Sequence, residues 1–176
     1  SILINKILKK KYKTVFIKKK YQNQKEEQKL LIKNGKLICE RSRSLSLAKA
    51  EGKGFNLAII DDGLQEKSIK YDISIACFNA TSKIGNGLTI PAGPLRENLS
   101  NLSDYDAVFI NGQKKNNKLK NKIKYYNNKI ELFQSEYKIK NLNKFDRSKK
   151  FLAFSGIGSP WEFKNTLIKN KFKIED

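Results

Sequence analysis

Two adjacent carboxylates, Asp61 and Asp62, stand at the end of an apolar run over residues 55–61 and directly before Gly63. Such neighbours repel each other unless a cation, a basic side chain or water separates them. An apolar strand that ends in Asp is also how phosphate-transferring enzymes hold Mg²⁺, beyond the carboxyl end of a parallel strand. The alternative is an ordinary turn in which Asp caps and Gly supplies a positive φ. The local pattern alone favours the turn.

A second stretch, IGNGLTIPAGPLREN over residues 84–98, combines three glycines and two prolines and is predicted to be an ordered loop. Arg96 and Glu97 follow Pro94, where a short helix could begin. An Arg in such a loop suits bidentate recognition of a phosphate group. The residues are equally compatible with an Arg–Glu surface pair, which contributes about 0–1 kcal/mol.

Two weaker candidates have a structural explanation that fits them better. Residues 154–160, FSGIGSP, could cradle an anion at a helix N-terminus, but a tight crossover is the favoured interpretation. Glu26 and Glu27 precede an apolar helical run and are best explained as first-turn acids that favour the helix dipole. The chain contains no G-x-x-x-x-G-K-[ST] loop and no His, so His metal sites and Ser-His or Cys-His catalysis are excluded within it.

The formal net charge of +20 comes mainly from lysine, because only four of the 37 basic residues are Arg. Nucleic-acid surfaces usually recruit Arg as well, and the lysines are spread along the chain. We therefore expect no nucleic-acid partner, and favour attraction to an anionic membrane surface or to phosphorylated ligands. No apolar run is long enough to span a bilayer. Cys39 and Cys77 lie in strand-like runs and are predicted to be buried free thiols.

The elements that must position these residues alternate between strands and helices. This order predicts the α/β class, a mostly parallel sheet with helices on both faces. A polar surface stretch is expected over 113–129. Near the end, Ser159, Pro160 and Glu162 predict a helix start with a capping box. Strands are expected at 13–17, 36–39, 55–61, 73–79, 107–111, 131–134, 137–139 and 151–157, and helices at 1–11, 26–33, 42–52 and 159–170.

Four motifs together resemble the tetraacyldisaccharide 4'-kinases, also called lipid A 4'-kinases. They are DDGLQ (61–65), GNGLTIPAGPLRE (85–97), DAVFING (106–112) and GIGSPWEF (156–163), in matching order and spacing. The resemblance implies a P-loop-kinase-like fold, with a kinase core over 1–125, and linker strands and the start of a smaller C-terminal α/β domain over 126–176. It also implies transfer of the γ-phosphoryl group of ATP, with Mg²⁺, to the 4'-hydroxyl of a tetraacyldisaccharide 1-phosphate, giving lipid IV-A in lipid A biosynthesis at the cytoplasmic face of the bacterial inner membrane.

The resemblance also assigns roles to individual residues. Asp61 and Asp62 would be catalytic acids that hold Mg²⁺, joined as metal ligand by Glu97. Arg96 would contact phosphate as a catalytic and nucleotide-binding residue, and Gln65 would also bind the nucleotide. Glu26 would take the place of a family Asp that is proposed to act in catalysis.

Several departures from the family pattern affect what this chain is expected to do. Glu66 stands where the family motif usually has His. The family's membrane anchor and Gly-rich loop are expected upstream of Ser1, and a partner His beyond Asp176, so this piece alone is expected to be inactive. A monomer is also expected. The alternative from another class is a basic α/β domain that binds nucleotide or nucleic acid without transferase activity.

Overall fold

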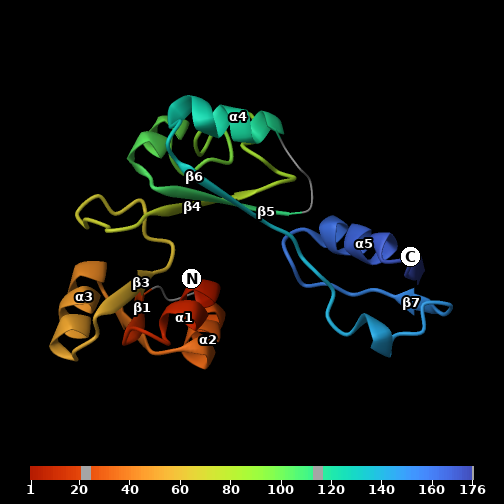
Figure 1. Ribbon diagram of the computed structural model, residues 1–176, viewed down its shortest axis with the longest axis horizontal. Coiled ribbons are helices and arrows are strands. Elements are labelled where there is room, and N and C mark those ends of the chain that lie inside the picture. Colours follow the sequence, from red (N-terminus) through yellow and green to blue (C-terminus); the bar gives the residue numbers. More distant parts are fainter. Residues whose placement is uncertain (21–24, 113–116, 176) are drawn as a thin grey trace. The chain divides into compact units, whose positions relative to one another are not determined.

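The computed structural model describes residues 1–20, 25–112 and 117–175, and these form two compact units, Ser1–Ser74 and Ile75–Asp176 (Figure 1). Both units are built from parallel strands and helices, so the predicted α/β class with a mostly parallel sheet is confirmed. No helix among the described residues is long and apolar enough to cross a membrane.

The first unit is a three-stranded parallel sheet with the strand order β2-β1-β3 and helices on both faces. Figure 1 shows α3 on one side of this sheet and α1 and α2 on the other. The central strand is buried on both faces, which explains its continuous apolar run. The elements are α1 (Ile2–Leu8), β1 (Thr14–Lys19), α2 (Lys25–Asn34), β2 (Leu37–Glu40), α3 (Arg43–Gly52) and β3 (Leu57–Ile60).

Alternate residues of β1 supply the cores on the two sides of the sheet. Phe16 packs with Leu31 of α2 and with its β3 neighbour, Ile59. Val15 and Ile17 pack on the other face, in a cluster that includes residues of α3. Side chains at the end of β1 continue this alternation between the two faces. They therefore lie between the sheet and the helices on one of its faces.

The second unit contains a parallel sheet of order β4-β5-β6 and a separate pair of parallel strands, β7 and β8. Its main core joins β5 to η1 and α4, with Val108, Ile110, Leu119 and Ile123 buried. The elements are β4 (Ile75–Asn79), η1 (Leu99–Asp104), β5 (Ala107–Asn111), α4 (Asn117–Tyr126), β6 (Glu131–Ser135), η2 (Leu142–Lys144), β7 (Lys150–Leu152), α5 (Pro160–Lys169) and β8 (Lys173–Glu175).

Several local predictions are wrong. Residues 117–126 of the expected polar surface stretch are mostly exposed, but they form helix α4, which was not predicted, and its Leu119 and Ile123 lie one turn apart and are buried. Residues 113–116 of that stretch lie outside the described residues. No strand forms over 137–139. Neither cysteine is buried, since Cys39 is half-buried and Cys77 is exposed, although the two form no disulfide.

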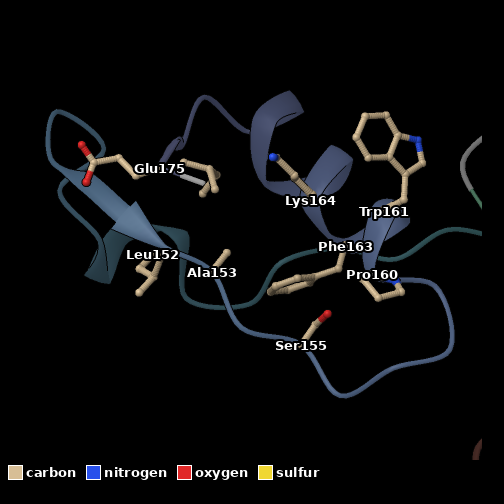
Figure 2. Close-up of a pocket in the computed structure, with 9 residues that line it drawn as sticks. Leu152, Ala153, Ser155, Pro160, Trp161, Phe163, Lys164 and Glu175 are labelled. Carbon is tan, nitrogen blue, oxygen red and sulfur yellow. The ribbon is translucent and has the colours of Figure 1, made fainter.

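Helix α5 begins at Pro160 after Ser159, as predicted, but without the capping box. The Ser159 side chain makes no capping hydrogen bond, and the Glu162 carboxylate instead accepts from Asn79 Nδ2 at 3.3 Å. A cavity of about 280 Å³ lies between α5 and the β7–β8 pair, and Figure 2 shows Phe163 directed toward Ala153 across it. Ser155 and Pro160 of the 154–160 stretch line this cavity, whereas none of the acids of the Asp61–Asp62 turn, the 84–98 loop or α2 does.

Candidate functional site

The strand register of the first unit brings Asp61 beside Lys18. Ile60 of β3 pairs with Ile17 of β1, and the Asp61 amide donates to the Ile17 carbonyl at 3.1 Å. The next position on β1 is Lys18, so both side chains leave neighbouring parallel strands at their carboxyl ends. The predicted acidic turn therefore stands at the edge of the sheet where ligands bind in parallel α/β folds.

Lys18 is a buried cation that joins two carboxylates. Its side chain is 3% exposed, and Nζ donates to Glu27 Oε2 at 2.6 Å and to Asp61 Oδ2 at 3.4 Å. Burial lowers the pKa of Lys18, but the hydrogen bond that Lys18 donates to Glu27 and the charge of Asp61 outweigh this, and the pKa lies above its ordinary value. A basic side chain thus compensates the charge of Asp61.

Asp62 is held through its backbone by Arg43, which lies at the start of α3. Arg43 Nη2 donates to the Asp62 carbonyl oxygen at 2.6 Å, and Nη1 donates to Glu66 Oε2 at 2.8 Å. The Arg43 side chain is 9% exposed, so this is a largely buried ion pair. The hydrogen bond from Arg43 holds the pKa of Glu66 below its ordinary value. Arg43 therefore ties the two ends of the turn to the helix.

The turn differs in one detail from an ordinary Asp-Asp-Gly turn. The positive φ belongs to Asp62, at 54°, and Asp is among the few residues that tolerate this conformation. Gly63 is buried and serves close packing instead, because a Cβ built on it would lie 2.4 Å from Ile60 Cγ2. The Tyr71 hydroxyl donates to the Gly63 carbonyl at 2.5 Å. The backbone is therefore fixed on both sides of Gly63.

The first-turn acids of α2 are confirmed as such, and they have different surroundings. Glu26 has a side chain that is 85% exposed and pairs with Lys29 at 2.8 Å. Glu27 is connected to Asp61 through Lys18. The catalytic role of Glu26 stays a prediction, as does nucleotide binding by Gln65, which is exposed in the same unit.

The loop over residues 84–98 belongs to the second unit, and the prediction that it is ordered is confirmed. Its two sides are joined by hydrogen bonds from the Ile90 amide to the Leu95 carbonyl and from the Leu95 amide to the Leu88 carbonyl. Arg96 is exposed, whereas Glu97 is half-buried. Two further groups fix Glu97, because its Oε2 accepts from Asn101 Nδ2 and from the Tyr105 hydroxyl, both at 2.7 Å. A helix follows the loop, but it begins at Leu99. The approach of Arg96 and Glu97 to the acidic turn stays a prediction.

The acidic turn has the donor chemistry of a magnesium site. Mg²⁺ takes oxygen ligands, usually one or two carboxylates completed by waters and substrate phosphates, and Asp61 and Asp62 supply such oxygens. Within residues 1–20, 25–112 and 117–175, no group of three or more Asp, Glu, Cys or His side chains could hold a metal ion by itself. Asp61 and Asp62 thus have the oxygens that the carboxylate part of such a ligand set requires.

Sequence reasoning found the acids of this site and missed its two buried cations. Lys18 is one of three successive lysines, and Arg43 lies two residues from another Arg, so neither stands out. The available signal was positional. Lys18 directly follows the apolar run of β1, at the same place where Asp61 follows β3.

Comparison with known proteins identifies the family. The family model described as tetraacyldisaccharide-1-P 4'-kinase matches residues 5–176. A tetraacyldisaccharide 4'-kinase of Pelagibacter ubique (strain HTCC1062) is 47% identical over 176 residues, which cover 99% of this chain and 56% of the relative. One from Rickettsia canadensis (strain McKiel) is 34% identical over 139 residues, 78% of this chain and 41% of the relative. The chain thus spans about half the length of the curated relatives it matches. No solved structure matches. The match along nearly all of its length shows that the chain belongs to the tetraacyldisaccharide 4'-kinase family.

Proposed function

We propose that this chain supplies part of an ATP-dependent kinase that phosphorylates the 4'-hydroxyl of a tetraacyldisaccharide 1-phosphate to give lipid IV-A. The family match over residues 5–176 carries the proposal. The geometry supports it, because the acidic turn stands at the carboxyl end of a parallel sheet and is held there by two buried cations, Lys18 and Arg43. A basic binding domain without transferase activity has no such support.

In this proposal the oxygens of Asp61 and Asp62 hold Mg²⁺, with Glu97 as a further ligand. When bound, the ion would neutralise charge on the phosphates of ATP. Hydrogen bonds within the second unit fix Glu97 in its loop, and Arg96 beside it is exposed and would contact phosphate oxygens. Gln65, exposed next to the acidic turn, would contact the nucleotide.

Glu26 is the proposed catalytic carboxylate of α2. Its side chain is 85% exposed, so it is accessible to a substrate hydroxyl, while Lys18 already engages its neighbour, Glu27. The pair with Lys29 is a surface ion pair of low strength and would not prevent this role. A role as general base is consistent with an exposed carboxylate at a helix start.

The remaining features of the proposal concern location and organisation. With a net charge of +20, the chain is suited to an anionic membrane surface, in keeping with a substrate that is a lipid at the cytoplasmic face of the inner membrane. We propose a monomer, with a kinase core over 1–125 and the start of a C-terminal domain over 126–176. The compact units of the structure divide the chain earlier, between Ser74 and Ile75.

A chimaera tests the proposed activity. The 176 aligned residues of the Pelagibacter relative are replaced by this chain, and transfer of labelled phosphate from ATP to tetraacyldisaccharide 1-phosphate is measured. We expect activity, and a loss of about 100-fold or more when Asp61 and Asp62 are both changed to Asn. The matched control changes Glu51 and Asp72 in the same unit to Gln and Asn. A folded but inactive chimaera, beside an active parent, would refute the proposal.

A further inference from the structure

Lys18 connects three elements of the first unit through one charged atom. It lies near the end of β1, Glu27 lies in the first turn of α2, and Asp61 follows β3. Holding an ammonium group at 3% side-chain exposure carries a desolvation cost that only close carboxylates offset. The two contacts differ in length, 2.6 Å to Glu27 and 3.4 Å to Asp61. The cation is therefore shared unequally, with the shorter bond to Glu27.

We propose that Lys18 is a positioning residue that holds the Asp61 carboxylate in place and limits the affinity of the acidic turn for a free divalent cation. The ammonium contacts Oδ2 of Asp61 and so fixes the carboxylate at the end of β3. A second cation bound at the same carboxylate meets the repulsion of Lys18 within a few ångströms. The metal-binding part of this inference rests on the proposed function.

The acidic turn is consequently expected to prefer a phosphate-bound divalent ion over the free ion. A free divalent ion gains only the carboxylates of the turn and must overcome the charge of Lys18. An ion that already carries phosphate oxygens brings compensating negative charge with it, so Lys18 opposes its binding less. The acidic turn is thereby arranged to take a metal–polyphosphate complex rather than the bare ion.

Glu27 sets how much of the Lys18 charge Asp61 experiences. Because Glu27 makes the shorter contact, it draws the ammonium toward α2 and partly neutralises it. When the Glu27 charge is removed, Asp61 is the one carboxylate still in contact with Lys18 among the described residues. The two substitutions, Lys18→Met and Glu27→Gln, therefore have opposite effects on cation binding, whereas loss of structure would weaken binding in both.

The experiment titrates the 176-residue chain with Mn²⁺ and measures free Mn²⁺ by electron paramagnetic resonance. We expect Lys18→Met to lower the dissociation constant by about threefold or more, and Glu27→Gln to raise it by about threefold or more. Lys29→Met and Glu51→Gln are the matched controls, because these exposed residues of the same unit carry the same charges, and each is expected to stay within about 1.5-fold of wild type. The proposal that Lys18 limits cation affinity would be overturned if the dissociation constant shifted equally in the variants and their controls. It would also be overturned if Lys18→Met and Glu27→Gln shifted the dissociation constant in the same direction.

A second measurement tests the positioning without any metal. Urea unfolding of Lys18→Met, Asp61→Asn and the double variant gives the coupling between the two residues. We expect the double variant to differ from additivity by about threefold or more in the unfolding equilibrium constant. Additive effects would overturn the positioning role. Coupling without any Mn²⁺ binding at the turn would leave Lys18 as the positioning residue, and would instead refute the metal role of Asp61 and Asp62 in the proposed function.

Discussion

Gly63 offers a direct test of how tightly the acidic turn is built. A Cβ on Gly63 would lie 2.4 Å from Ile60 Cγ2 and 3.3 Å from the Tyr71 hydroxyl oxygen, whereas ordinary contacts are 3.4–4 Å. Ile60 is β-branched and belongs to β3, so it has little freedom to turn away. A shift of the backbone instead would pull the Asp62 carbonyl from Arg43 Nη2, now 2.6 Å away.

The expected cost of Gly63→Ala follows from this overlap of about 1 Å. Forcing an extra methyl group into a close-packed site costs about 1–3 kcal/mol. The reduced entropy of the unfolded chain offsets about 0.4–1 kcal/mol of this. We therefore expect Gly63→Ala to lower the free energy of unfolding by about 1–2 kcal/mol.

The assay is urea unfolding followed by circular dichroism, combined with hydrogen exchange over residues 57–66 to locate the loss. Gly52→Ala is the matched control, because no atom lies within 4 Å of a Cβ built at that position near the end of α3. That control is expected to be neutral or to stabilise the chain by up to about 1 kcal/mol. Equal stability of the two variants would refute the close packing of the turn.

Three further outcomes are expected. Glu66→Gln should lower the melting temperature at pH 7 but much less at pH 3. The pKa of Glu66 is depressed in the folded state, so the stability that its charge contributes is present at neutral pH and is lost as pH falls through the folded pKa. An equal loss of melting temperature at both pH values would contradict this. Ile123→Ala should cost about 2–5 kcal/mol in urea unfolding, since Ile123 is fully buried in α4, and a cost below about 1 kcal/mol would argue against that helix. Binding to anionic lipid vesicles should fall steeply between about 20 and 150 mM salt, and binding to neutral vesicles should be absent throughout; salt-independent binding would exclude an electrostatic origin.

The elements of the first unit follow from the sequence because burial on both faces leaves a plain signal. The predicted strand at 13–17 and helix at 42–52 agree closely with β1 and α3, where Ser42 accepts the capping hydrogen bond from the Leu45 amide. In α4, by contrast, Lys and Asn dominate and only two apolar positions carry the helical period. The polar composition therefore gave no indication of helix α4, which is stabilised by packing with the sheet.

For a related reason, the sequence predicted the acids of the candidate site but not its cations. Adjacent acids before a glycine form a local pattern, so Asp61 and Asp62 can be found by reading along the chain. Their cations come from residues 43 positions and 19 positions away, at Lys18 and Arg43. Only the pairing of β1 with β3 and the placement of α3 bring them to the turn. Among 37 basic residues, composition gives no reason to select these two.

The two acids of the turn are stabilised in different ways, and the difference bears on function. Lys18 compensates Asp61 through its carboxylate, whereas Arg43 holds Asp62 through the backbone carbonyl and directs its charge to Glu66. The charge of Asp61 is therefore compensated by a lysine that also pairs with Glu27, whereas the Arg43 contact with Asp62 does not involve the Asp62 carboxylate. Changing Asp62 to Asn would thus leave the Arg43 hydrogen bond in place, whereas changing Asp61 to Asn would remove a charge that offsets the burial of Lys18.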